Sequence, residues 1–237
     1  MDDNLIKAGT ENFSLPHDVV KFPTGGKFYK NKKKSIKVGY LTASDENMLL
    51  NALENNASEL TYQLLRSKIY EPDVRPEDLL NEDIESILLF LRNTSFGPEY
   101  IFKLKDPATS KMFEQTVTLD ELDINKPDVE PTEEGCFIVK LPKSDVTVKI
   151  KPITFGENRE LESQKKKYPL GRVAPVVNWR LEKQIVELNG NTDKGEISKF
   201  INGMPIFDSK FIRNFLNKNV PSLDLRRKIY APSGELV

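Results

Sequence analysis

Apolar residues in this 237-residue chain follow two different spacings, and the order in which these spacings alternate limits the folds that the chain can adopt. Ile36, Val38 and Tyr40 alternate with polar or small residues, which is the period-two pattern of a half-buried strand. Residues 19–22 form an earlier apolar stretch, and a segment rich in lysine and glycine separates the two stretches. We therefore expect strands at 19–22 and 36–41 that form a β-hairpin.

Helical spacing follows this predicted hairpin. Three apolar stripes recur at helical spacing, formed by Met48, Leu49, Ala52 and Leu53, by Leu60, Leu64, Leu65 and Ile69, and by Ile84, Ile87, Leu88 and Leu91. Ser44 or Asp45 is expected to cap the first helix, and Pro72 and Pro76 are expected to separate the second helix from the third. Because the third stripe has apolar neighbours on more than one face, its helix should be buried by its own module or by a partner.

The period returns to two after Gly97 and Pro98. Tyr100, Phe102 and Leu104 alternate with other residues, and residues 113–119 follow the same pattern. Asp106 and Pro107 begin the loop between the two stretches, so this region predicts a second β-hairpin.

The second half of the chain begins in the same way as the first. Two alternating stretches at 137–141 and 146–150 flank the turn sequence PKSD and predict another hairpin. Three helical stripes follow, formed by Val177, Leu181, Ile185 and Leu188, by Ile197, Phe200 and Ile201, and by Phe211, Ile212, Phe215 and Leu216. Asp208 or Ser209 is expected to cap the last helix, and residues 230–237 are expected to form no further paired element.

A weak internal repeat connects the two halves. KVGYLTASDENMLL from Lys37 and KIKPITFGENRELE from Lys149 align at a constant offset, so that Thr42 matches Thr154 and Asp45 matches Glu157. Each segment predicts a strand that ends at threonine and leads into a helix with an acidic first turn, where the free N–H groups favour a carboxylate. Although strand–threonine–helix junctions are common, the shared order of elements favours a diverged duplication.

The predicted fold is α+β with two tandem modules, each a β-hairpin followed by a small helical cluster, and the first with an additional β-hairpin. Residues 1–17 have no clear apolar period and are interpreted as a flexible N-terminal arm. The first module covers 18–122 and the second, related module covers 136–237. Between them, residues 123–135 are acidic and proline-rich, which is typical of a linker.

Composition excludes several functional classes. Hydrophobic residues make up 38% of the chain, enough for a packed core, while 35 lysine and arginine residues oppose 36 acidic residues. The resulting net charge of −1 is unlike the basic bias of nucleic-acid or anionic-membrane binders. The N-terminus lacks the features of a signal peptide, no apolar run has the length of a membrane span, and a single cysteine forms no disulfide framework.

The sequence contains few candidate catalytic residues. His17, the single histidine, lies in the predicted arm, so we interpret it as an incidental surface residue. Cys136 begins a predicted strand among apolar neighbours and is interpreted as an inert buried thiol. The pair Gly25-Gly26 lacks the strand–glycine–helix order of a phosphate loop. We therefore expect a protein that is not an enzyme and that binds no cofactor.

An ordered set of motifs resembles a known family. FPTGGKFY, LTASDENMLL, LLRSKI and PEDLLNEDIESILLFLRNTSFGPEY occur in this order, followed by a hairpin and LDEL. This order, over residues 18–124, resembles the baseplate hub-assembly family of T-even-type contractile phages. LPKSDVTVKIKPIT, ELNGNTDK and FDSKFIRNFL extend a weaker resemblance into the second half.

The chain departs from that family at two loops. Many members have a Cys-x-x-Cys knuckle in the hairpin that follows the GPEY strand, and some have a second one near the C-terminus. Here the corresponding loops are KDPATSKMFEQ and APSG, which contain neither cysteine nor histidine. Because a tetrahedral zinc site needs such ligands, no metal is carried over from the resemblance.

The resemblance implies a baseplate hub component or hub-assembly factor that acts through protein–protein contacts. The implied partners are other phage baseplate, hub or tail-tube proteins, with homo-oligomer formation as a further option and no membrane. The implied location is the virion tail baseplate, the host cytoplasm during assembly, or both. The alternative from another class is a nucleic-acid-binding module that uses lysine-rich loop tips, although nucleic acid is not the expected partner.

The first predicted hairpin contains the candidate partner-binding residues, which are Phe22, Pro23, Phe28, Tyr29, Lys30, Lys32, Lys33 and Lys34. Its aromatic side chains are either core residues or anchors of an interface. Its lysines, like those at 165–167, are interpreted as charged groups that keep a hairpin tip and a helix end soluble. Their other interpretations are contact with phosphate and docking onto an acidic face of a neighbouring subunit.

Overall fold

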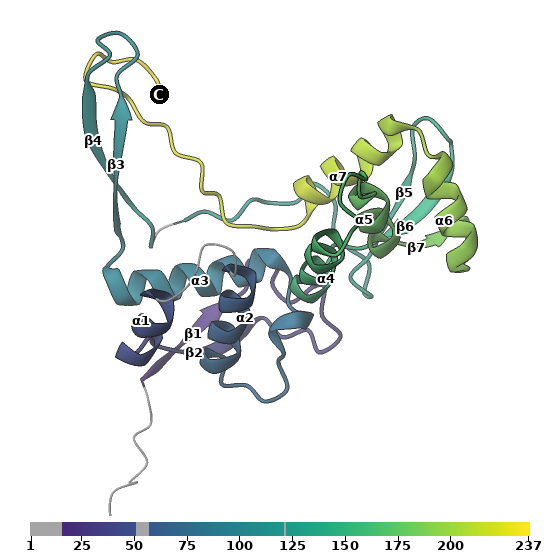
Figure 1. Ribbon diagram of the computed structural model, residues 1–237, viewed down its shortest axis with the longest axis horizontal. Helices are drawn as coiled ribbons and strands as arrows, with labels where there is room; N and C mark the ends of the chain where they lie inside the picture. The colour runs from purple at the N-terminus through teal and green to yellow at the C-terminus, as the bar shows by residue number, and fades with distance from the viewer. Residues whose placement is uncertain (1–15, 51–56, 121) are drawn as a thin grey trace, which may run out of the picture.

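The computed structural model of the protein describes residues 16–50, 57–120 and 122–237. Its elements form two α+β halves, and a two-stranded arm projects from the first half (Figure 1). The predicted α+β class, with β-hairpins followed by helices, is confirmed. The predicted helical positions Ala52 and Leu53 lie outside the described residues. So does most of the flexible N-terminal arm predicted at residues 1–17, which is distinct from the two-stranded arm.

The N-terminal half packs helices against a two-stranded sheet. β1 (His17–Lys21) pairs antiparallel with β2 (Ser35–Gly39), and they are followed by α1 (Ala43–Leu50), α2 (Ala57–Lys68), the 3₁₀ turn η1 (Pro76–Asp78) and α3 (Asn81–Phe96). Buried members of the shared core include Val20, Ile36, Val38, Leu65, Ile87 and Leu91. The alternating strand residues and the helical stripes of α2 and α3 therefore supply this core.

The C-terminal half contains a three-stranded antiparallel sheet with the order β5-β6-β7. Its elements are β5 (Phe137–Lys140), β6 (Thr147–Ile150), α4 (Phe155–Lys166), α5 (Val176–Gln184), β7 (Ile185–Leu188), α6 (Lys194–Gly203) and α7 (Ile206–Asn219). Its core includes Phe137, Leu141, Val148, Ile150, Leu181 and Ile212. Each half thus has its own apolar cluster, and each cluster gains one buried residue from the other half, Leu80 in the C-terminal cluster and Phe155 in the N-terminal cluster.

The predicted helical stripe that ends at Leu188 is wrong in its second part. Helix α5 ends at Gln184, and the next residues form β7 on the open edge of β6. Ile185 and Val186 are β-branched and favour a strand, while the β6 edge and Lys151 N–H offer backbone bonds that continue the sheet. Tertiary pairing therefore overrides a spacing that is compatible with a helix.

The predicted cap of the first helix is corrected by the structure. The Thr42 hydroxyl accepts the Asp45 N–H at 3.4 Å, and Asp45 accepts the Thr42 N–H at 2.7 Å, so neither Ser44 nor Asp45 occupies the cap position. Thr154 and Glu157 form the same reciprocal capping box at the start of α4. The two threonines aligned in the sequence repeat therefore have the same structural role.

Two buried aspartates hold the hairpin turns of the two halves. Asp83, the third residue of α3, accepts bonds from the N–H of Thr24 at 3.1 Å and from its hydroxyl at 2.7 Å. Asp208, the third residue of α7, accepts the N–H groups of Lys143 and Ser144, both at 2.9 Å. Both aspartates are 0% exposed. Asp208 therefore fixes the β5–β6 turn. The prediction that Asp208 or Ser209 caps α7 is wrong, because both lie inside the helix and Pro205 occupies the cap position.

A third extended segment follows the second helix in each half. In the C-terminal half this segment is β7, in which Ile185 pairs with Ile150 of β6. In the N-terminal half it is reduced to a single antiparallel bridge between Ile69 and Val38, supported by a bond from Tyr70 N–H to Lys37. These matching contacts support the duplication, which stays a proposal about the origin of the chain.

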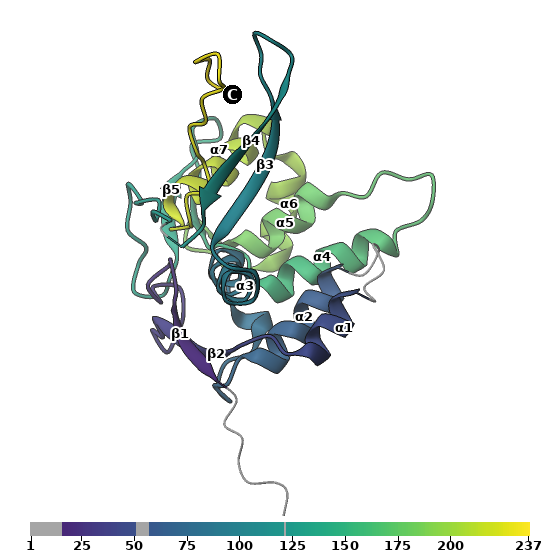
Figure 2. The ribbon, with the colours of Figure 1, turned by 90° about the vertical axis from the view of Figure 1, so that its left-hand side faces the viewer.

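The arm consists of β3 (Glu99–Lys105) and β4 (Met112–Thr118), which pair antiparallel and project away from α3 (Figures 1 and 2). The C-terminal segment reaches its tip, where the Ser233 hydroxyl donates to buried Asp106 at 2.9 Å. Tyr230 and Leu236 also form an antiparallel bridge, so the expectation that residues 230–237 contain no paired element is wrong. The two loops that lack knuckle cysteines therefore meet through hydrogen bonds.

The segment 123–135 runs alongside the chain that follows α7. Asn125 N–H donates to Ser222, and the Asn219 side chain accepts the N–H groups of Asp128 and Val129. Backbone bonds therefore fix part of the segment that was predicted to be a linker. The exact limits of the two modules stay a prediction.

We expect Asp208→Asn to lower the free energy of unfolding by about 2 kcal/mol, because the amide replaces one of the two charged acceptors with a donor that faces the N–H of Lys143 or Ser144. The Asp145 side chain lies in the same turn and is 82% exposed. Asp145→Asn should therefore change the free energy of unfolding by no more than about 0.5 kcal/mol. Urea unfolding of both variants provides the measurement. Equal stability of the two variants would contradict the role given to Asp208.

Candidate interaction surface

The loop between β1 and β2, residues 22–34, contains every candidate partner-binding residue, and it starts inside the fold. Phe22 is 4% exposed and Pro23 is buried, so of the two interpretations left open for them the structure favours core residues. A Cβ on Gly26 would lie 2.4 Å from the Lys33 carbonyl oxygen, and its φ of 74° also favours glycine. The turn thus closes tightly on the core.

Phe28 and Tyr29 connect the two halves. The Phe28 ring lies 5.9 Å from the ring of Phe137 in the C-terminal core. Tyr29 packs against both cores, donates its hydroxyl hydrogen to Asp83 and accepts the Leu80 N–H at 2.9 Å. These two aromatic side chains therefore stabilise an internal interface. Whether they also contact a partner stays a prediction.

The four candidate lysines of this loop, Lys30, Lys32, Lys33 and Lys34, do not form one free patch. Lys30 and Lys34 are exposed. Lys32 donates to the backbone oxygens of Lys27 and Glu133, and Lys33 forms an ion pair with Asp73 at 2.8 Å. Two lysines thus hold the loop to other parts of the chain, whereas two extend into solvent.

A cavity of about 420 Å³ lies beside this loop. Its apolar lining includes Phe22, Phe28, Val74 and Leu79, and its charged lining includes Lys30, Lys33, Asp73, Arg75 and Asp78. An apolar floor with a mixed-charge rim resembles the core and rim of a small protein-binding site. The charges at the rim have both signs and therefore do not select phosphate.

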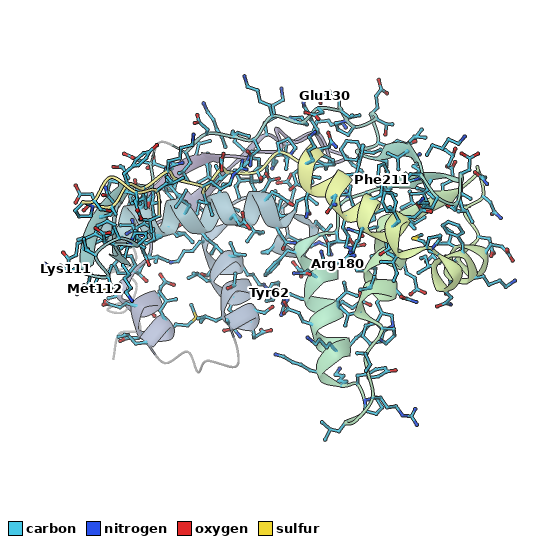
Figure 3. The ribbon with its side chains drawn as sticks, turned by 90° about the horizontal axis from the view of Figure 1, so that it is seen from above. Tyr62, Lys111, Met112, Glu130, Arg180 and Phe211 are labelled. Carbon is cyan, nitrogen blue, oxygen red and sulfur yellow. The ribbon has the colours of Figure 1, made fainter. Side chains whose placement is uncertain are left out.

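A second contact joins the two halves on the side of α2 and α4. The Arg159 guanidinium lies 4.0 Å from the centre of the Tyr62 ring and bonds Glu59 at 2.5 Å. Tyr62 donates to Glu77 at 2.8 Å, and Gly156 packs so closely on Glu77 that an added Cβ would lie 2.8 Å from it. Figure 3 shows Tyr62 on the side of its half that faces the other.

The loop after α4 forms a prominent projection, which we call the cationic projection (residues 165–175; Figures 2 and 3). Leu170 is 102% exposed and Val173 is 92% exposed. The lysines at 165–167 and Arg172 are exposed and form no salt bridge with any described residue. At the base of the projection, the Tyr168 ring makes an edge contact with the Trp179 ring, with the two ring centres 5.5 Å apart.

Sequence reasoning identified the lysines of this projection but not its apolar residues. Leu170 and Val173 belong to no periodic stripe, so no pattern marked them. The signal that was available is the turn sequence YPLGRVAP, whose prolines and glycine predict a loop that would expose any apolar residue within it. Neighbouring apolar and unpaired cationic groups at one tip fit contact with a protein.

His17 and Cys136, the residues considered for catalysis, pack against other parts of the fold. His17 lies in β1 with its ring 5.6 Å from that of Tyr70. Burial raises the pKa of Cys136, which keeps the thiol protonated and weakly nucleophilic. Within the described parts of the chain, no three His, Cys, Asp or Glu residues are grouped so that they would hold a metal ion.

The start of α3 has unusual electrostatics. Burial and the charge of Asp83 raise the pKa of Tyr29, so its hydroxyl stays a donor. Burial also raises the pKa of Glu82 from 4.5 to about 7, although the charge of Arg180 opposes this change. This carboxyl group therefore titrates near neutral pH at the junction between α3 and the C-terminal half.

Comparison with known families identifies the class of protein. A family model described as T4 bacteriophage base plate protein matches residues 19–233, which is nearly the whole chain. The chain therefore belongs to the family of T4 bacteriophage base plate proteins. Comparisons with curated proteins and with solved structures give no match.

Family membership confirms the resemblance found in the sequence. It implies contacts with other phage structural proteins and indicates the tail of the virion as the location. None of the described helices combines the length and apolar character needed to cross a membrane.

Glu82 predicts a measurable pH dependence of stability. Because the folded chain holds this proton more tightly than the unfolded chain, the contribution of Glu82 is complete below pH 4.5 and is lost as the pH rises through about 7. In urea unfolding between about pH 5 and about pH 8, Glu82→Gln should therefore lose less stability than the wild type.

The matched control is Glu133→Gln, which neutralises an exposed carboxylate. Its stability should fall with pH as steeply as that of the wild type. An unchanged slope in Glu82→Gln would show that this carboxyl does not titrate near pH 7.

Proposed function

We propose that this base plate protein is a component of the baseplate hub, or a factor that assembles the hub, and that it acts by docking onto other proteins. The hub assignment rests on the ordered motifs from FPTGGKFY to GPEY. The docking mechanism rests on the cationic projection, which is the observation that carries the proposal. No enzymatic step is part of it, because the buried carboxylates Asp83 and Asp208 hold backbone and hydroxyl groups of the fold.

The cationic projection fits a partner with an apolar pocket surrounded by acidic residues. Leu170 and Val173 extend fully into solvent, so a pocket that encloses them removes apolar surface from water. Arg172 and the neighbouring lysines lie close to these two side chains in sequence and have no carboxylate partner of their own among the described residues. An acidic rim would therefore gain opposite charge without breaking an existing ion pair.

A second contact is proposed at the loop between β1 and β2. Lys30 and Lys34 are exposed there, and Lys30 borders the cavity whose floor includes Phe22 and Phe28. A short apolar segment of a neighbouring baseplate, hub or tail-tube protein would fit this cavity. In this arrangement Lys32, Lys33 and Tyr29 keep the loop in place, and Pro23 starts it from the core.

The alternative of a nucleic-acid-binding module uses the same lysines. A nucleic-acid surface carries phosphates, which gain nothing from the two apolar side chains at the tip. We therefore propose protein as the partner. Binding of the purified chain to duplex DNA, with an affinity that falls steeply as salt increases, would support the alternative instead.

The proposed docking role predicts the effect of removing the apolar tip. In a phage that depends on a supplied copy of this chain, Leu170→Ser with Val173→Ser should lower the number of complete tails by tenfold or more. The fold should be unaffected, because both side chains lie in solvent. Tails are counted by electron microscopy of lysates.

Ile138→Ser is the matched control, because Ile138 is 64% exposed and lies on β5, away from the projection. It should leave the number of tails unchanged. Normal tail numbers with the double variant would contradict the docking role of the projection.

Mass spectrometry of purified virions separates the two forms of the proposal. A permanent hub component is expected in the particle at a fixed ratio to other tail proteins. An assembly factor is expected in the host cytoplasm, bound to incomplete hubs, and absent from the particle. Absence from both fractions would contradict both forms.

A further inference from the structure

The β3–β4 arm is an isolated two-stranded sheet with an apolar face. The cross-strand pairs Tyr100 with Val117 and Leu104 with Phe113 lie on the same face as Phe102. None of these five side chains is fully buried. A two-stranded hairpin is marginally stable in water unless further strands or another layer join it.

The outer edge of β3 is available for another strand. Asp106 N–H bonds Lys111 and Leu119 N–H bonds Pro98, which shows that the even-numbered residues of β3 direct their backbone bonds toward β4. The odd-numbered residues therefore direct theirs outward. Among the described residues, none bonds the backbone of Ile101 or Lys103, and the Glu99 carbonyl accepts one bond from Arg92.

Two opposite charges lie at the two ends of this edge. Lys103 forms an ion pair with Glu114 across the hairpin at 3.5 Å. Glu99 and Lys105, the first and last residues of β3, form no ion pair with any described residue. Strong opposite charges at the two ends of one strand match each other when two copies of that strand run antiparallel.

We propose that β3 pairs antiparallel with β3 of a second copy of this chain, about a twofold axis at Phe102. Glu99 then lies opposite Lys105 of the second copy, and Lys105 lies opposite its Glu99. Ile101 lies opposite Lys103 of the second copy, and all four positions are ones whose backbone groups point outward. A four-stranded sheet results, with the order β4-β3-β3-β4.

Two neighbouring registers are less favourable. An axis at Ile101 would place Glu99 opposite Lys103 of the second copy, but Lys103 already forms an ion pair with Glu114, and Lys105 would lie beyond the start of β3 of the second copy. An axis at Lys103 would place the two Lys103 side chains opposite each other and leave Glu99 beyond the end of β3 of the second copy. The β4 edge contains a single charged residue, Glu114, so self-pairing of β4 gains no opposite charges. With the axis at Phe102, Tyr100 lies beside Leu104 of the second copy and the apolar faces of both arms become continuous.

The proposal concerns two copies of the purified chain, so it does not depend on the proposed role in the hub. A contact of one strand with another covers a small area, and we expect weak association that requires a high protein concentration. The first measurement is sedimentation equilibrium of the full chain. It should show a concentration-dependent increase from 27.1 kDa to twice this mass.

Charge reversal tests the register. Glu99→Lys gives an edge with lysine at both ends, and Lys105→Glu gives an edge with glutamate at both ends. Each variant alone should dimerise about tenfold more weakly than the wild type, because both cross-strand pairs become repulsive. An equimolar mixture of the two variants should restore dimerisation, because both pairs are then opposite in charge, and this restoration shows that both variants are folded.

Lys126→Glu, which reverses an exposed charge outside the arm, is the control and should dimerise like the wild type. Hydrogen exchange of the wild type should show concentration-dependent protection of the Ile101 and Lys103 amides. A chain that stays monomeric, as it would if the edge receives a strand of a different protein, overturns the proposal. So does a dimer that neither single reversal weakens, or a mixture that fails to associate.

Discussion

The fold depends on one interaction that occurs twice, in which a buried aspartate in the first turn of a helix accepts hydrogen bonds from the turn of a β-hairpin. Asp83 binds Thr24 in the N-terminal half, and Asp208 binds the turn after Leu141 in the C-terminal half. A carboxylate buried at 0% exposure is stable only when such donors replace its water. Each hairpin is thereby fixed to the helical layer that covers it.

The same interaction leads to the junction between the halves. Asp83 also accepts the hydroxyl hydrogen of Tyr29, and that hydroxyl accepts the backbone N–H of Leu80. The loop that contains Tyr29 therefore stays in contact with both cores, with Phe28 against Phe137. Because Phe28 and Tyr29 of this loop are used internally, other parts of the chain present groups outward, namely the cationic projection and the β3–β4 arm. This division between internal and external groups suits a family of base plate proteins.

The sequence predicted those features that depend on local spacing. The strands at 36–41 and 137–141 and the threonine junctions at Thr42 and Thr154 follow from alternation and from the needs of a helix start. It did not predict β7, because the spacing of Leu181 and Ile185 also fits a helix and only the open edge of β6 decides between them. The apolar side chains of the cationic projection were missed because they belong to no periodic stripe.

In the proposed docking role, the cationic projection presents unpaired charge and apolar surface to an acidic neighbour. Zero-length carbodiimide cross-linking of baseplate intermediates from infected cells, followed by mass spectrometry, detects this contact. We expect amide links between the lysines at 165–167 and carboxylates of another baseplate protein. Links from these lysines only to residues of this same chain, in intermediates that contain it, would contradict the docking role.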